Sequence, residues 1–213
     1  MFNIIMSYYA VSNGKNIGIF SNWKDCNNSV KGYKNALYKK FNTEEEAIDF
    51  INKTKYHKKK FDDNPDYYVY TDGACSNNGK DNAKAGIGIF FGIDDKRNVS
   101  KNIDGKQTNN TAELTAIIET FNIIKNDIKN NKRIIIFSDS MYAIRCVTSY
   151  GEKCYKKNWE VDIPNKELVK IAYELYKDIL NIQLVYIKAH TNKSDIHSFG
   201  NDNADRLAKL AIN

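Results

Sequence analysis

The C-terminal two thirds of the chain alternates between the apolar spacing of strands and that of helices. Short apolar runs bounded by turn residues predict five strands, at residues 67–70, 85–92, 99–103, 134–137 and 182–187. Apolar side chains at helical spacing predict four helices, at residues 111–128, 141–147, 168–179 and 202–210. This order of elements predicts an α/β fold, with a five-stranded mixed sheet flanked by helices.

The N-terminal part has a different pattern and predicts a small α+β unit over residues 7–53. Two short apolar runs flank the turn sequence Asn13-Gly14, which favours a hairpin, and a third strand is expected at 36–41. Thr43 and Glu46 then have the capping-box spacing of a helix start.

A lysine-rich linker is expected at residues 54–65, before a larger domain at 66–213. Its lysines either form a solvated spacer or also attract phosphate, and the sequence leaves both readings open. The whole chain carries a net charge of +6. Residues 1–64 hold 11 Lys and Arg against 7 Asp and Glu, so most of the excess lies there. Such a balance is compatible with nucleic-acid binding without being specific for it.

The composition argues against several other classes of protein. Hydrophobic residues make up 42% of the chain, which is enough for a packed core. No apolar run approaches the ~20 residues that cross a membrane, and the first residues lack the pattern of a signal peptide. The four cysteines show no C-x-x-C pairing, so free thiols are expected rather than zinc. We therefore expect an intracellular, reducing compartment. Cytoplasm, nucleus and an organelle all stay open, as do Met1 and Met6 as the start.

Four carboxylates stand where predicted elements end or begin. Asp72 follows the first strand of the larger domain, and Asp139 follows the wholly apolar strand. Because the carboxyl ends of parallel strands meet at one edge of a sheet, these two are expected to share a crevice. Glu113 is expected in the first turn of the helix over residues 111–128, and Asp205 in the first turn or two of the last helix. Singly, each of the four is also explained by turn chemistry or by the helix dipole.

The sequences around these carboxylates form four motifs: Tyr70-Thr71-Asp72-Gly73, Thr108-Asn109-Asn110-Thr111-Ala112-Glu113, Phe137-Ser138-Asp139-Ser140 and Gly200-Asn201-Asp202-Asn203-Ala204-Asp205. In this order they resemble type 1 ribonuclease H over essentially all of residues 67–213. The resemblance implies a ribonuclease H-like fold and an endoribonuclease that hydrolyses the RNA strand of RNA–DNA hybrids. It implies a two-metal-ion mechanism with Mg²⁺, or Mn²⁺ as an alternative, giving 5′-phosphate and 3′-hydroxyl ends. The implied metal ligands are Asp72, Glu113, Asp139 and Asp205. Two divalent cations would offset four carboxylates that otherwise repel one another.

The same resemblance places a catalytic histidine at His190, after the last predicted strand. Its expected role is to move a proton, in particular around product release. The loop from His190 to Asp205 is longer than is common in the family, and His197 lies within it as a competing candidate. Asn201 matches a position of the family that helps to hold the part of the site where the phosphodiester is attacked.

Residues that contact the two strands of a hybrid are also implied by the resemblance. Sequence-independent recognition of RNA depends on 2′-hydroxyl groups, which amides bind well. The RNA-strand residues are Asn78, Asn109 and Asn110. The DNA-strand residues are Lys106, Thr108, Tyr150, Tyr155 and Asn165. Asn110 departs from the glutamine that is common there, Lys106 from an arginine, and the two tyrosines from tryptophans.

The small unit resembles the hybrid-binding domain found at the N-terminus of many eukaryotic enzymes of this type. The implied contact residues are Trp23, Tyr38, Lys39 and Lys40, with Tyr38 in place of a frequent phenylalanine. An aromatic ring packs on a sugar while lysines neutralise phosphates. The alternative is that Trp23 belongs to the core and that the lysines form a solvated strand face.

Two rival functions remain at the level of sequence. One is a non-catalytic protein that binds hybrids or double-stranded RNA, although all four carboxylates are retained. The other is an integrase-like nuclease of the same fold, which would lack the small unit and the Thr108-Asn109-Asn110 segment. The expected partner is an RNA–DNA hybrid, with double-stranded RNA as a second ligand of the small unit. We expect a monomer that does not bind membranes.

Overall fold

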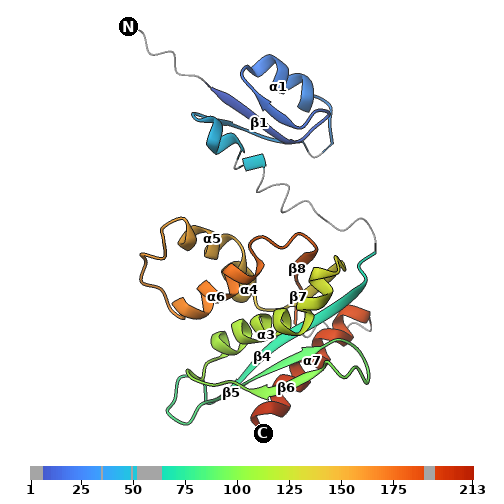
Figure 1. The fold of residues 1–213 in the computed structure, drawn as a ribbon, viewed down its shortest axis with the longest axis vertical. Coiled ribbons are helices and arrows are strands. Elements are labelled where there is room, and N and C mark those ends of the chain that lie inside the picture. The colour runs from blue at the N-terminus through green and yellow to red at the C-terminus, as the bar shows by residue number, and fades with distance from the viewer. Residues whose placement is uncertain (1–6, 35, 49, 52–63, 190–194) are drawn as a thin grey trace. The chain divides into compact units, whose positions relative to one another are not determined.

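The computed structural model describes residues 7–213 apart from 35, 49, 52–63 and 190–194. The chain divides into two compact units, residues 1–62 and 63–213, which are described separately (Figure 1). Among the described residues, no helix has the length and apolarity needed to cross a membrane. The predicted linker lies almost wholly outside the described residues.

The larger unit is built on a five-stranded mixed sheet, as predicted. Its strands lie in the order β6-β5-β4-β7-β8. Their bounds are Tyr67–Ser76 for β4, Lys84–Phe90 for β5, Val99–Asn102 for β6, Ile134–Ser138 for β7 and Ile182–Tyr186 for β8. The strands β4, β7 and β8 are parallel, whereas β5 and β6 join the other side of β4 in antiparallel pairs. The long strand β4 is therefore the centre of the sheet.

Helices cover both faces of this sheet (Figure 1). Their bounds are Asn109–Lys129 for α3, Met141–Val147 for α4, Ser149–Tyr155 for α5, Lys166–Tyr176 for α6 and Ile196–Ile212 for α7. The main core joins α3, α4, α5 and α6 to one face of the sheet, where Val69 and Ile136 are fully buried. On the other face Tyr70 and Phe137 pack with Ala204 of α7. The alternation of side chains along each strand thus separates two apolar layers.

Several element boundaries differ from the sequence prediction, and three of them change where a predicted site residue lies. The strand β4 continues to Ser76, so Asp72 lies inside a strand rather than after it. The extra residues are held by antiparallel pairing with β5, which is a long-range interaction. The helix α3 begins at Asn109 after its cap Thr108, which places Glu113 in the second turn.

The start of α7 was also predicted wrongly. The helix begins at Ile196, six residues before the predicted start, so Asp205 lies in its third turn. Asp195 is the N-cap, and its carboxylate accepts hydrogen bonds from the backbone amides of His197 and Ser198, each at 3.0 Å. Capping of this kind satisfies amides that have no partner within the helix.

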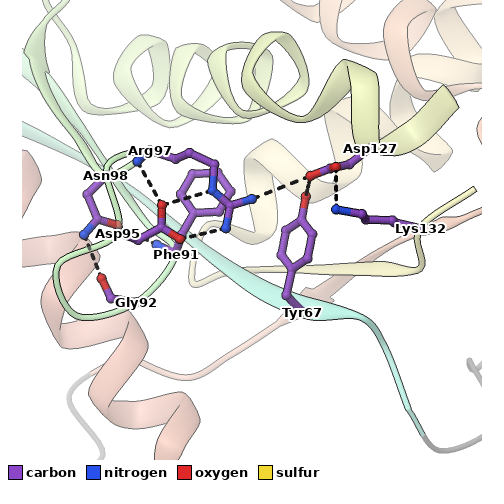
Figure 2. A network of polar contacts seen from close by, with 8 residues as sticks. All are labelled: Tyr67, Phe91, Gly92, Asp95, Arg97, Asn98, Asp127 and Lys132. Carbon is purple, nitrogen blue, oxygen red and sulfur yellow. Dashed lines mark hydrogen bonds and ion pairs between the residues drawn. The ribbon is translucent and has the colours of Figure 1, made fainter. Parts of the chain in front are cut away.

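A network of charged and aromatic side chains ties the β5–β6 loop to the first residue of β4 and to the end of α3 (Figure 2). Arg97 donates two hydrogen bonds to Asp95, at 3.0 and 2.7 Å, and its guanidinium lies over the rings of Tyr67 and Phe91. Asp127 of α3 accepts a 2.6 Å hydrogen bond from the Tyr67 hydroxyl. The same carboxylate pairs with Arg97 at 3.6 Å and with Lys132 at 2.8 Å. We call these residues, with Phe91, the Arg97 network.

The smaller unit has a three-stranded antiparallel sheet in the order β2-β1-β3. Its elements are β1 (Tyr8–Asn13), β2 (Gly18–Phe20), α1 (Trp23–Val30) and β3 (Leu37–Phe41), followed by helical residues at 44–48 and 50–51. This last helix starts as predicted, with the Glu46 amide donating to Thr43 Oγ1 at 3.2 Å. The helix α1 was not predicted. Its visible signal is Asn22, whose side chain caps it by accepting from the Asp25 amide at 3.0 Å.

Candidate active site

The site begins with two carboxylates that parallel pairing sets side by side. Ser138, the last residue of β7, is opposite Thr71 of β4. The residue that follows each of them in the sequence is an aspartate: Asp139 follows Ser138, and Asp72 follows Thr71. The prediction that these two share one edge is correct, although Asp72 reaches it from within a strand.

Glu113 joins them because α3 passes very close to β4. A Cβ atom on Gly73 would overlap the backbone of Ala112 and Glu113, so only glycine permits this approach. Ala112 and Glu113 are buried, with 0% and 4% of their surface exposed. Because of this close approach, α3 and β4 each contribute a carboxylate to the same cluster.

The three side chains form a compact acidic group. One oxygen from each of Asp72, Glu113 and Asp139 lies within 4.8 Å of the other two. They line a pocket of about 650 Å³ that also contains Asp205, Asn109 and other residues. We call Asp72, Glu113 and Asp139 the acidic triad.

The electrostatics of the triad are unfavourable for ionised carboxylates. Burial, followed by the charges of Asp139 and Asp205, raises the pKa of Asp72 to about 8, although the Gly73 amide donates to it at 2.7 Å. Burial and the neighbouring Asp72 and Asp139 raise the pKa of Glu113 well above its ordinary value. Like charges held together in a poorly solvated place have this effect. The site therefore favours either protons or bound cations.

A divalent metal ion fits this group of side chains. Hard oxygen ligands at short mutual distance are what Mg²⁺ and Mn²⁺ prefer. The Oε2 atom of Glu113 is buried and has no hydrogen-bond partner among the described residues. An atom of this kind costs free energy unless a ligand satisfies it. Asn201, itself 1% exposed, supports the triad by donating from Nδ2 to Asp139 Oδ2 at 3.4 Å.

Asp205, the fourth predicted ligand, lines the pocket but is not part of the triad. Its Oδ2 atom accepts a 2.7 Å hydrogen bond from Nζ of Lys209, one turn further along α7. Lys209 was missed by the sequence reasoning. Its signal was the spacing of four residues from Asp205, which places opposite charges together on a helix.

Of the two candidate histidines, the structure describes only His197. His190 lies outside the described residues, so its predicted role stays a prediction. His197 is packed in an aromatic group, with its ring centroid 4.4 Å from that of Phe137 and 5.0 Å from that of Tyr68. Its Nδ1 atom is 3.0 Å from the Tyr70 hydroxyl. His197 does not line the pocket, so its place in the structure favours an anchoring role for the start of α7.

The predicted RNA-strand residues lie in the turn after β4 and in the first turn of α3, just after the loop that leads into this helix. Asn78 accepts a 3.3 Å hydrogen bond from the Asn109 amide, and Asn109 lines the pocket. Asn110 is exposed on the first turn of α3. Gln107, missed by the sequence reasoning, fixes this loop, because its Oε1 accepts from the Ala85 amide at 2.7 Å. The sequence carries no local signal for that contact with β5.

The predicted DNA-strand residues are spread over three places: the start of α3, the helix α5 and the residue before α6. Thr108 caps α3 in a reciprocal pair with Thr111, and Lys106 is exposed just before it. Asn165 precedes α6 in a left-handed conformation with φ of 57°, and donates to the Tyr142 hydroxyl at 3.1 Å. Polar groups at two helix starts therefore remain candidates for a phosphate.

The two predicted tyrosines lie on the short helix α5. Tyr155 is 43% exposed and packs against Tyr173, with 5.5 Å between ring centroids. The Nζ atom of Lys177 lies 4.4 Å from the centre of the Tyr155 ring. Tyr150 is partly buried against the main core. Tyr155 is thus the more accessible of the two.

In the smaller unit, the predicted contact residues do not all share a face. Trp23 lies between Tyr9 and Tyr38, each with its ring centroid 5.8 Å away, and is 47% exposed. This exposure argues against the alternative that Trp23 is a core residue. Lys40 extends over the Tyr9 ring, whereas Lys39, the next residue along β3, lies over Phe41. Successive side chains of a strand point to opposite faces.

Comparison with known proteins defines the class of molecule to which this fold and acidic group belong. A family model described as RNase H matches residues 64–213, and a model described as Ribonuclease H1 N-terminal domain matches residues 7–51. The chain belongs to the ribonuclease H family, whose members are metal-dependent nucleases.

The similarity to particular relatives extends over both units. A ribonuclease H of Schizosaccharomyces pombe is 31% identical over 95% of this chain and 96% of its own length. Among solved structures, the PFV RNase H domain has a TM-score of 0.54 at 20% identity, covering 70% of this chain and 94% of that one. A foamy viral protease-reverse transcriptase, solved in complex with RNA/DNA hybrid, also has a TM-score of 0.54, at 19% identity. That match covers 69% of this chain and 20% of the viral one, and both solved structures support the fold alone.

Proposed function

We propose that this protein hydrolyses the RNA strand of RNA–DNA hybrids with two Mg²⁺ ions, giving 5′-phosphate and 3′-hydroxyl ends. The observation that carries the proposal is the acidic triad, with three carboxylate oxygens within 4.8 Å of one another. The Schizosaccharomyces pombe relative is named a ribonuclease H, and its similarity extends over both units, which supports this activity. A viral structural neighbour of the same fold was solved with an RNA/DNA hybrid, and the proposal carries this class of substrate over to the present chain.

The residues that would hold the ions are Asp72, Glu113 and Asp139, with Asp205 at the pocket wall. Two divalent ions held there would supply a nucleophilic water on one side of a phosphodiester and would stabilise the leaving oxygen on the other. The Gly73 amide orients the Asp72 carboxylate, and Asn201 orients that of Asp139. His190 is proposed to move a proton near the departing product.

Selection of a hybrid is proposed to come from two groups of residues. Asn78, Asn109 and Asn110 offer amide and carbonyl groups to the 2′-hydroxyls of the RNA strand beside the pocket. On the DNA side, Lys106 and the polar helix starts at Thr108 and Asn165 would bind phosphate, with Tyr150 and Tyr155 against the strand. Lysine meets phosphate as a point charge, without the paired hydrogen bonds of arginine.

The smaller unit is proposed to hold the enzyme on its substrate. The exposed ring of Trp23 beside Tyr38 and Lys40 provides stacking and charge on one face. Lys39, on the opposite face, would contribute less than Lys40. A Trp23→Ala, Lys39→Ala, Lys40→Ala variant should lose affinity for hybrid and processivity while still cleaving saturating short hybrids. Its affinity should also depend less on salt, because fewer phosphates are neutralised.

The function is tested by one substrate comparison. Labelled RNA–DNA hybrid, double-stranded RNA and double-stranded DNA are each incubated with the full chain, with Mg²⁺ or with a chelator. The expected result is loss of RNA in the hybrid alone, only with Mg²⁺, and products whose 5′ ends carry phosphate. Binding of hybrid without cleavage would support the rival non-catalytic protein instead, and cleavage of double-stranded DNA would favour an integrase-like nuclease.

A further inference from the structure

Lys209 is the basic side chain of the acidic pocket. Within the described part of the chain, the pocket lining contains four carboxylates and one cationic residue, Lys209. Its ammonium donates to Asp205 Oδ2 at 2.7 Å. Asp205, Asp72 and Asp202 all act to hold the pKa of Lys209 above its ordinary value, and the hydrogen bond that Lys209 donates to Asp205 has the largest effect. The ammonium therefore lies within the field of the same carboxylates that the metal needs.

The bond between Lys209 and Asp205 accounts for the way the carboxylates are grouped. Asp72, Glu113 and Asp139 bring their oxygens together, whereas Asp205 is engaged by its own helix. A carboxylate that accepts a hydrogen bond from an ammonium has one ligand oxygen less to offer to a metal ion. The ammonium occupies one lone pair of Oδ2, and its positive charge opposes an ion that approaches Asp205, so binding of an ion there favours departure of the ammonium.

The lysine is free to make that movement. The side chain of Lys209 is 57% exposed, whereas that of Asp205 is 20% exposed. An exposed pair on a helix is worth little free energy, so its rupture costs little. The pair can therefore be displaced by a doubly charged ion that the whole cluster attracts.

We propose that Lys209 is a built-in competitor for divalent metal ions at Asp205, occupying this carboxylate in the metal-free protein and leaving it when an ion binds. The inference rests on the proposed function, because it assumes that the pocket binds such ions. It gives Lys209 a specific consequence: its ammonium lowers the affinity of the pocket for Mg²⁺ and raises the Mg²⁺ concentration at which the enzyme is half active.

An ordinary helix-surface ion pair would have no such consequence. Opposite charges four residues apart stabilise many helices slightly, wherever they occur. Removal of the lysine would then change stability a little and leave metal affinity unchanged. Metal affinity, measured without substrate, separates the two roles.

The experiment is a calorimetric titration of the full-length protein with Mg²⁺, repeated with Mn²⁺, in the absence of nucleic acid. Four proteins are compared: the wild type, Lys209→Gln, Lys209→Arg and Lys177→Gln. The arginine variant keeps a cation near Asp205. The Lys177→Gln variant removes a lysine that pairs with Glu174 on α6 at 3.0 Å and does not line the pocket. Thermal unfolding of each variant verifies that it is folded, and the 57% exposure of the Lys209 side chain makes this the expected result for its two variants.

Lys209→Gln should bind the ions about two- to tenfold more tightly than the wild type, the range expected for losing one cation near partly screened carboxylates. Lys209→Arg and Lys177→Gln should stay within about twofold of the wild type. Equal affinity of Lys209→Gln and wild type would overturn the inference and leave the proposed function intact. Equal tightening by Lys177→Gln would also overturn it, by showing a general effect of net charge. If the wild type bound neither ion, the inference and the metal assignment of the proposed function would fall together.

Discussion

The larger unit contains two groups of charged side chains that are built in opposite ways. The Arg97 network mixes signs: Asp95 and Asp127 face Arg97 and Lys132 at 2.7 to 3.6 Å (Figure 2). Hydrogen bonds from Arg97 and from Lys132 hold the pKa values of Asp95 and Asp127 below their ordinary values. In the acidic triad, burial and neighbouring carboxylates raise the pKa values of Asp72 and Glu113 instead.

The difference shows which carboxylates the chain neutralises itself and which it leaves for a cation from solution. In the Arg97 network, the protein itself supplies the cations, Arg97 and Lys132. These contacts hold the β5–β6 loop against the end of α3. In the triad, burial has the largest effect on the pKa values of Asp72 and Glu113, and the next largest effect comes from a neighbouring carboxylate. Such an arrangement lowers the stability of the metal-free protein and is favourable only when a cation binds.

The largest expected effect of breaking this contrast is on catalysis. Asp139→Asn and Asp95→Asn make the same chemical change, one in each group. Asp139→Asn should slow cleavage of a hybrid by more than about 100-fold, since loss of a residue that merely supports a metal ligand typically costs 10–100-fold. Asp95→Asn should leave the rate within about twofold. Single-turnover rates at saturating Mg²⁺ measure both, and a wild-type rate for Asp139→Asn would remove the metal-site assignment.

A second effect is on the stability of the metal-free protein. The folded pKa of Asp72 is about 8, above its ordinary value of 3.8, so ionisation favours unfolding as pH rises between these values. In chelator, the Tm of the wild type should therefore fall between pH 5 and pH 8.5. Asp72→Asn should fall less and melt several degrees higher at pH 8.5, where each kcal/mol moves Tm by about 2–4 °C in a chain of this size. Mg²⁺ should raise the Tm of the wild type more than that of the variant.

Removal of the central cation of the network should have a smaller effect, and on stability alone. Arg97→Met keeps much of the apolar length of the side chain but loses its hydrogen bonds to Asp95 and its contacts with two aromatic rings. Allowing for the 38% exposure of the Arg97 side chain, the free energy of unfolding should fall by roughly 1–2 kcal/mol. Urea unfolding of the larger unit measures this. A changed affinity for Mg²⁺ in this variant would show that the two groups are not independent.

The smallest expected effect is on the free energy of unfolding at acidic pH. Because the folded pKa values of Asp95 and Asp127 are lowered, their contribution to stability is present above their ordinary value of 3.8 and is lost as pH falls through the folded values. For partly exposed pairs this loss should be under about 1 kcal/mol each. Unfolding curves of the wild type and Asp95→Asn below pH 4 should therefore converge. A constant difference down to pH 2 would argue against these ion pairs.

The sequence was sufficient for the sheet because apolar runs bounded by turn residues are local signals. The acidic residues carried no decisive signal one at a time, and they were singled out by the order of four motifs that resemble type 1 ribonuclease H. The structure places Asp72 and Asp139 side by side as expected. The position of Asp72 inside β4 was not visible, because it depends on hydrogen bonds to β5 across a hairpin.

Other features depend on residues that are far apart in the chain. The Arg97 network joins Tyr67, Arg97 and Asp127, whose separations carry no periodic signal. Gln107 binds the Ala85 amide across 22 positions. The early start of α7 had a local signal in Asp195 and Ser198, which was overlooked because the apolar pattern is clearer from Asp202 onward. The anchoring of His197 by Tyr70 follows from that earlier start.

The most direct test of the contrast between the two groups is to locate bound metal. Crystals of the full-length protein soaked in Mn²⁺ would be measured for anomalous scattering at the manganese edge. The account predicts anomalous peaks in contact with Asp72, Glu113 and Asp139, and none at Asp95 or Asp127. A triad without metal at millimolar Mn²⁺, or a peak at the Arg97 network instead, would contradict it.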